Sequence, residues 1–235
     1  MIKKITTLAL VPFMITTLTM AEDDYISSSG ADTDKPFTIG LKAGTLGVGV
    51  DVSKPITKNV SLRINANGFS YNRTGTQEDI QYDADVELSN VGFIADYYPY
   101  ETTPFKISAG VYYNGNTANA KGIPSSGGTY TIDGIDYKAS EIGSIDGSVE
   151  FQEVAPYLGI GWGEQSTEKG FGFSIDVGAM TGNPEANLVA TRGTVNDAIW
   201  RSIEESVQNE ENTLNDDLSD YGIYPVIMVG FTYTF

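Results

Sequence analysis

The chain has 235 residues and a formal net charge of −17, and it contains neither cysteine nor histidine. Without cysteine there can be no disulfide and no thiol chemistry, and without histidine the most common general base of hydrolases is missing. A strongly acidic protein is also a poor partner for nucleic acid, because the phosphates repel it. We therefore expect no enzyme and no nucleic-acid binding, and we assign no catalytic residue, no metal ligand and no cofactor.

The first 21 residues resemble a secretory signal peptide. Lys3 and Lys4 precede an apolar stretch, 5–18, which ends in small residues just before an acidic run. The alternative is a membrane anchor, but the apolar stretch is short for a helix that needs about 20 residues. We predict that 1–21 is removed, which leaves 12 basic residues against 31 acidic ones, a net charge of −19. Residues 22–36 are acidic and rich in serine, and we expect them to form a disordered leader.

From residue 37 onwards, apolar and polar residues alternate in segments separated by turns, as in strands with two different faces. We predict eight antiparallel strands, at 37–43, 46–54, 59–72, 82–98, 105–117, 148–163, 170–182 and 222–235. The alternation reverses at Gly44–Thr45, and the first two segments are separate strands only if this reversal is a hairpin. If it is a bulge, one strand is missing, and the run "EANLVATR" at 185–192 is the candidate. A second reversal, at Ser89–Asn90, interrupts the fourth segment.

The polar side of these strands distinguishes a soluble barrel from a membrane barrel. It is rich in glycine and serine, as expected for the crowded interior of a narrow closed barrel. It also carries nearly balanced charges, which are tolerated inside a protein when they are paired. We predict that these charges form a network in the lumen, made by Lys42, Asp51, Arg63, Asp96, Lys106, Glu153 and Asp176. The apolar side, with aromatic residues near the strand ends, would then face lipid.

The C-terminal strand alternates apolar residues up to a terminal phenylalanine. Phe231, Tyr233 and Phe235 resemble the C-terminal signal of bacterial outer-membrane barrels, which implies the barrel-assembly machinery as a partner. The connections 54–59, 100–104 and 164–169 are short, whereas 72–81, 117–147 and 181–221 are long. Since outer-membrane barrels have short periplasmic turns and long external loops, we predict extracellular loops and periplasmic termini.

Four motifs carry a resemblance to a known family: "KAGTLG" at 42–47, "NGFSY" at 67–71, "APYLGIGWG" at 155–163 and "IYPV" at 223–226. With them the chain resembles a family of small, largely uncharacterised outer-membrane barrels of Gram-negative bacteria, and more broadly the eight-stranded outer-membrane protein A/X class. The resemblance covers about 37–235 and implies a barrel in the outer membrane, in contact with its lipids and lipopolysaccharide. It implies no catalytic residues.

Two insertions contain further elements. Residues 194–220 have apolar residues at helical spacing, with Thr194 and Asp197 as a capping box and an acidic opposite face. The opposite face is either solvated or a site for a cation or partner. In the other insertion, Asp133–Gly134 predicts a hairpin at 129–137. Its two tyrosines either pair across the strands or are exposed to bind a protein or glycan.

Three functions fit these expectations. The first is a structural or interaction protein, with a side-chain-filled lumen and acidic external loops that serve adhesion or envelope integrity. The second is a porin-like narrow channel for ions or small solutes, which is disfavoured because side chains about fill an eight-stranded barrel. The third, a lipid-modifying enzyme, is disfavoured by the missing histidine.

Overall fold

The computed structural model describes residues 36–77, 80–100, 102–124, 128–163 and 168–235. The predicted signal peptide, 1–21, and residues 22–35 of the predicted leader lie outside the described residues. Lys35–Phe235 forms one compact unit. Its described part is an antiparallel all-β structure with one helix, in which an 11-stranded sheet is accompanied by a two-stranded hairpin.

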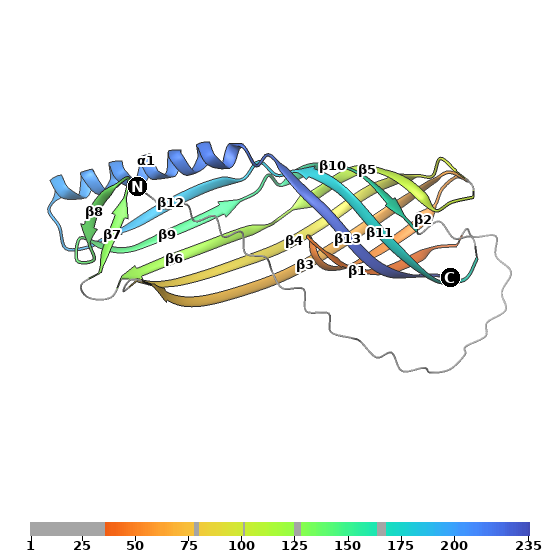
Figure 1. The fold of residues 1–235 in the computed structure, drawn as a ribbon, viewed down its shortest axis with the longest axis horizontal. Coiled ribbons are helices and arrows are strands. Elements are labelled where there is room, and N and C mark those ends of the chain that lie inside the picture. The colour runs from red at the N-terminus through yellow and green to blue at the C-terminus, as the bar shows by residue number, and fades with distance from the viewer. Residues whose placement is uncertain (1–35, 78–79, 101, 125–127, 164–167) are drawn as a thin grey trace. The chain divides into compact units, whose positions relative to one another are not determined.

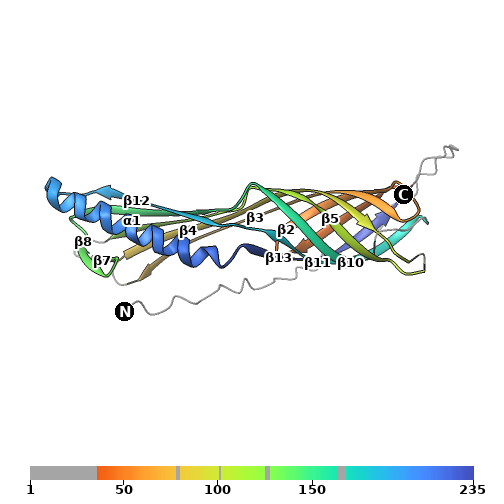
Figure 2. The same cartoon turned by 90° about the horizontal axis from the view of Figure 1, so that it is seen from above.

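Eight strands of the large sheet pair in a closed cycle, which we call the ring (Figures 1 and 2). Each strand pairs with its neighbour in the cycle, and the last strand pairs with the first along Thr38↔Thr234 to Gly44↔Met228. In order around the ring, the strands are β1 (Thr38–Gly44), β2 (Gly47–Pro55), β3 (Val60–Gln77), β4 (Ile80–Tyr97), β5 (Phe105–Asn114), β10 (Val154–Trp162), β11 (Gly170–Thr181) and β13 (Ile223–Thr234).

The reversal at Gly44–Thr45 is a tight hairpin and not a bulge. Gly44 pairs with Gly47 across a two-residue turn, and β1 and β2 are separate strands of the ring. Gly47 adopts a φ of 96°, a conformation that glycine tolerates and other residues rarely adopt. The hairpin is tied to β13, because the Thr45 N–H donates to the Ile227 carbonyl at 3.0 Å.

The predicted loop 72–81 is instead a continuation of two ring strands. β3 and β4 are paired without interruption from Val60↔Tyr97 to Gln77↔Ile80, well beyond the end of β2. Their distal parts join three further strands in the order β12-β9-β6-β4-β3. These are β6 (Thr117–Pro124), β9 (Ile142–Glu150) and β12 (Glu185–Arg192). We call this five-stranded sheet, with residues 69–77 of β3 and 80–89 of β4, the extension (Figure 2).

Two further strand predictions are corrected by the extension. The run 185–192, the candidate had the reversal been a bulge, is a strand, but it is β12 and pairs with β9 outside the ring. The predicted strand 148–163 is two strands, since β9 ends at Glu150 in the extension and β10 begins at Val154 in the ring. The long insertions are therefore folded and not simple loops, and they contribute β6, β9 and β12 to the extension.

The reversal at Ser89–Asn90 involves no shift in strand register. Asn67↔Asn90 and Gly68↔Ser89 are successive partners in an unbroken ladder. The apolar residues change faces because the surroundings change. In the ring, Val91 and Phe93 point outward and are exposed, whereas Leu88 and Val86 lie on the face that continues the ring interior.

One face of the extension is covered by the helix α1 (Asp197–Ser219) and by the hairpin of β7 (Thr129–Ile132) and β8 (Ile135–Lys138). The helix matches the predicted range 194–220, but its N-cap is Asn196, whose side chain accepts from the Ile199 N–H. Asp133 and Gly134 form the predicted turn, with φ of 50° and 73°. The cluster between these elements contains Tyr130, Ile132, Tyr137, Ile142, Ile203 and Val207.

Tyr130 and Tyr137 are direct cross-strand partners and are buried, at 6% and 5% exposure. The Tyr130 hydroxyl donates to the Gly122 carbonyl at 2.8 Å, and the Tyr137 hydroxyl contacts Ser206 Oγ at 2.8 Å. The alternative that these rings are exposed for binding is therefore wrong. They anchor the hairpin to β6 and α1.

Candidate functional site: the interior of the ring

A network of buried charges occupies the ring interior. Arg63 is at its centre: its Nε and Nη2 donate to the two carboxylate oxygens of Asp96 at 2.8 and 3.0 Å. Its Nη1 donates to Asp51 at 3.3 Å and to Asp176 at 3.2 Å. A guanidinium suits this position, because its planar fork binds a carboxylate with two parallel hydrogen bonds.

Two lysines complete the network. Lys42 Nζ lies 2.7 Å from Asp176 and also pairs with Asp51, and Lys106 Nζ lies 3.0 Å from Asp176. The three cations and three carboxylates come from six of the eight ring strands and are almost completely buried. We call this set the charge network: Lys42, Asp51, Arg63, Asp96, Lys106 and Asp176. Its formal charges cancel, which reduces the cost of keeping it away from water.

Six of the seven residues predicted for the lumen therefore meet in one cluster, and Glu153 does not. Glu153 is exposed and precedes the first residue of β10, so it lies outside the alternation that would turn it inward. Its carbonyl accepts from the Asn114 N–H at 2.6 Å. The prediction failed there because it assumed one continuous strand over 148–163, whereas β9 ends at Glu150.

Small polar side chains support the carboxylates. Ser108 Oγ donates to Asp96 at 2.5 Å, and the Asn65 amide donates to Asp51. Glycines leave room for the long side chains: a Cβ on Gly161 would lie 2.7 Å from Lys106 Cε, and one on Gly230 2.5 Å from Lys42 Cγ. The glycine-rich inner face is thus a packing requirement of the charge network.

A second layer fills the interior on the side of the network nearer the extension. It is apolar, and Tyr112 and Tyr157 meet edge to face in it with ring centroids 5.4 Å apart. We call this cluster the plug: Leu46, Ile94, Tyr112, Ala155, Tyr157, Met180, Val226 and Met228. The sequence reading missed the plug as a unit, although Tyr112 and Tyr157 on an otherwise glycine-rich face were a usable signal.

The outer surface of the ring is apolar. Val48, Leu158 and Phe231 are 63%, 65% and 74% exposed. The outward residues of all eight strands are almost uniformly aliphatic or aromatic, as illustrated by Leu41, Val50, Leu62, Phe93, Ile107, Ile160, Val177 and Ile227. An exposed apolar surface of this extent is not expected on a protein face that contacts water.

Aromatic side chains gather at the end of the ring that carries Phe37 and the C-terminus. Phe37 stacks on Phe235 at 4.8 Å, Tyr233 contacts Phe235 at 4.8 Å, and Phe105 contacts Trp162 at 6.1 Å. Of the three residues predicted as an assembly signal, Phe231 and Tyr233 lie on the outward side of β13 and touch rings of β11. Phe235 directly follows β13 and stacks on Phe37, which precedes β1.

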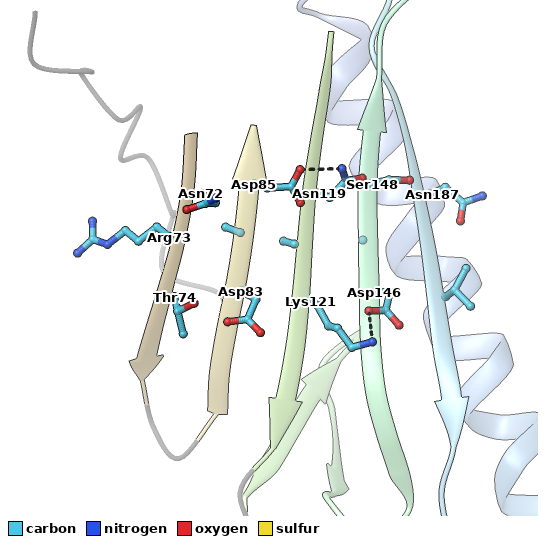
Figure 3. A pocket seen from close by; sticks show the side chains of 14 residues that line it. Asn72, Arg73, Thr74, Asp83, Asp85, Asn119, Lys121, Asp146, Ser148 and Asn187 are labelled. Carbon is cyan, nitrogen blue, oxygen red and sulfur yellow. Dashed lines mark hydrogen bonds and ion pairs between the residues drawn. The ribbon is translucent and has the colours of Figure 1, made fainter. Parts of the chain in front are cut away.

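The extension has a second candidate surface, an open polar groove on the face away from α1 (Figure 3). Asn119 donates to Asp85 at 3.2 Å, and Lys121 lies 3.2 Å from Asp146, so its polar groups interact across the strands. Further lining residues are Asn72, Asp83, Ser148 and Asn187. Within the described ranges, no group of three or more potential ligands is arranged to hold a metal ion. The described helical residues contain no segment that is long and apolar enough to span a membrane.

The fold is similar to that of two solved structures from Acinetobacter baumannii. CarO is 24% identical, with a TM-score of 0.56, and the match covers 85% of this chain and 98% of that one. CarO2 is 21% identical, with a TM-score of 0.57 and coverage of 87% and 100%. At these identities the likeness establishes the fold. No protein-family model matches the chain, and the comparison with curated proteins gives no match.

Proposed function

We propose that this protein is an integral outer-membrane β-barrel with a closed lumen and a folded platform outside the membrane, serving a structural or interaction role in adhesion or envelope integrity. The observation that carries this proposal is the filled interior. The charge network and the plug occupy the ring at two successive levels, and both are almost fully buried. An interior of this kind favours a scaffold over a channel, in line with the narrow bore of eight-stranded barrels.

The membrane location is supported by the outer surface. Outer-membrane barrels carry an outward apolar band flanked by aromatic residues, and the ring has exposed aliphatic side chains with aromatic contacts at the end that carries Phe37 and Phe235. A closed ring also leaves no unpaired strand edge to face lipid. Phe231, Tyr233 and Phe235 would be read by the barrel-assembly machinery, and the outward surface would contact lipid and lipopolysaccharide.

The orientation follows from the two ends of the ring. Connections at the terminal end are short, at 56–59, 98–104 and 163–169, whereas the extension projects from the other end. Bacterial barrels have short periplasmic turns, so we assign the terminal end to the periplasm and the extension to the outside of the cell.

Two measurements on the purified protein test this proposal. A folded barrel should migrate differently on a gel before and after boiling, and it should require detergent to stay in solution. Reconstituted into planar bilayers, it should give no resolved conductance under conditions in which a general porin does. A protein soluble without detergent would contradict the membrane assignment, and stable conductance steps would favour the narrow channel over the scaffold.

A further inference from the structure

The two edge strands of the extension differ in whether their outer backbone groups are hydrogen-bonded. At the β12 edge, the Asn215 side chain accepts from the Ala186 N–H at 2.7 Å and donates to the Ala186 carbonyl at 2.9 Å. Glu211 accepts from the Leu188 N–H at 2.7 Å. The helix thus supplies hydrogen bonds that a neighbouring strand would supply, which protects this edge from pairing with another chain.

The opposite edge has no such cover. β2 pairs with β3 only as far as Val48↔Gly68, and beyond that point β3 pairs with β4 alone among the described residues. The described side chains from 69 to 75 are all exposed. We call residues 69–77 of β3 the free edge. A row of backbone groups without a strand beside it is a template for an added strand.

The two faces of the free edge differ in chemistry. On one face, Phe69 and Tyr71 are 39% and 54% exposed, and their direct partners on β4 are Leu88 and Val86. Arg73 follows on the same face, opposite Ala84. This face offers exposed aromatic surface directly beside the edge. Apolar side chains of an added strand would pack against these rings as cross-strand neighbours.

The other face is acidic. Ser70, Asn72 and Thr74 of β3 are short and polar, and their direct partners on β4 are Glu87, Asp85 and Asp83. Among the described residues these carboxylates make no ion pair: Asp85 accepts from Asn119, and Asp83 has only long contacts of 3.4 and 3.5 Å to Gln81. The three acids recur at every second residue, with the spacing of one face of a strand.

We propose that the free edge binds an extended cationic peptide segment of a partner protein by strand addition. Strands are about 4.8 Å apart, so an added strand would lie about 10 Å from β4. Only a long side chain reaches that far, and the stems of lysine and arginine can cross the short residues of β3 to place a charge near the carboxylates. The segment therefore alternates lysine or arginine on the acidic face with apolar residues on the aromatic face.

A second copy of this chain fits the free edge less well. Antiparallel pairing of two free edges keeps the same face of both sheets on the same side, so it would bring two rows of aspartate and glutamate onto one surface. Lys121 lies beside Asp83 on this face, but it pairs with Asp146. The net charge of −17 adds to the repulsion between copies. A basic partner relieves the same charge.

The probe is a nine-residue peptide that alternates lysine with valine, added to the purified full chain in a non-ionic detergent. Binding is followed by fluorescence anisotropy, and hydrogen exchange locates the contact. We expect slower exchange in 69–77 and no change in 185–192, where the helix already covers the edge. A peptide in which glutamate replaces lysine, and a lysine–valine peptide N-methylated throughout, should both fail to bind.

Two double variants test the acidic face. Asp83→Asn with Glu87→Gln should weaken binding of the lysine–valine peptide by about fivefold or more, since exposed ion pairs are individually modest. Glu150→Gln with Glu185→Gln makes the same charge change on the same face at the far strands and should change affinity less than about twofold. Equal losses in the two variants, or full binding of the N-methylated peptide, would overturn strand addition at the free edge.

Discussion

Arg63 joins three carboxylates of the charge network. Its guanidinium donates to Asp51, Asp96 and Asp176, which lie on three other strands. Asp96 receives two charged hydrogen bonds from Arg63 and a neutral one from the Ser108 hydroxyl. A carboxylate left buried without a cation is costly, because burial removes the water that would otherwise stabilise its charge.

Replacing Arg63 by alanine should therefore lower the free energy of unfolding by about 3–5 kcal/mol, the usual cost of removing one partner of a buried ion pair. Urea unfolding of the detergent-solubilised protein, followed by tryptophan fluorescence, measures this difference. The matched control is Lys121→Ala, because Lys121 pairs with Asp146 at 3.2 Å but both side chains are nearly half exposed. The control should cost less than about 1 kcal/mol, and similar losses in both variants would mean that the network does not stabilise the ring.

Tyr130 provides a pH-dependent readout of the extension. Its burial, with smaller contributions from Tyr82 and Asp146, raises the pKa of its hydroxyl to about 12. The ordinary value is about 10, so the fold favours the neutral phenol that donates to Gly122. The stabilisation is complete below the unfolded pKa and is lost as the pH rises from about 10 through 12.

The difference between the parent and Tyr130→Phe tests this assignment. Tyrosinate absorbance is recorded for both proteins as the pH rises, and the subtracted curve should have its midpoint near 12. A midpoint near 10 would mean that the hairpin of β7 and β8 does not bury this ring on the extension.

At the scale of elements, the ring could be predicted from the sequence and the extension could not. Ring strands have apolar residues on the outer side and mostly polar or small residues on the inner side, so each shows clear alternation. Even the hairpin at Gly44–Thr45 appears as a reversal. The distal parts of β3 and β4 leave these surroundings. Residues 69–75 are exposed on both faces, so apolar and polar residues no longer alternate clearly along the strand. Such a strand has the composition of a loop.

Ser89–Asn90 shows the same limit within one strand. The reversal there was detectable in the sequence, but its cause is a change of surroundings along an unbroken ladder, which local alternation cannot distinguish from a bulge. The positions of β6, β9 and β12 beside β4 depend on pairings between residues distant in the chain. Such pairings leave no local signal.

The capped edge of β12 provides a test at this scale. Replacing Asn215 by alanine removes both hydrogen bonds to Ala186. We expect at least tenfold faster hydrogen exchange in 185–192, since losing the partners of half-buried backbone groups costs about 1–3 kcal/mol. Gln208→Ala, at an exposed helix position, is the control and should leave the exchange unchanged. Unchanged exchange in both variants would show that Asn215 does not act as an edge cap.

For the whole molecule, the decisive feature is that one continuous sheet surface changes polarity. Along β4, the outward residues Phe93 and Val91 are apolar, whereas Glu87, Asp85 and Asp83 on the same side are acidic. The opposite side changes the other way, from the buried Asp96 and Asn90 to Leu88 and Val86. A boundary between an apolar and an aqueous medium near Ser89 would account for both changes at once, and it supports the proposed position of the bilayer.

The two layers inside the ring close it in series, and this arrangement predicts how conductance would respond to mutation. Tyr112→Ala with Tyr157→Ala removes the two aromatic rings that meet in the plug, but it leaves the charge network in place. Arg63→Ala disturbs the network, but the plug remains. In planar bilayers, each of these variants should remain non-conducting, because either layer alone still fills the narrow bore.

The triple variant Tyr112→Ala, Tyr157→Ala and Arg63→Ala should give small, resolved conductance steps, because both layers are then incomplete. The control combines three truncations on the outer surface, Leu158→Ala, Val177→Ala and Ile227→Ala, which reduce exposed apolar area and leave the interior unchanged. Gel migration before and after boiling confirms that each variant is folded. Conductance in the tyrosine variant alone would mean that the charge network does not close the lumen, because ions would then pass it without any change to Arg63.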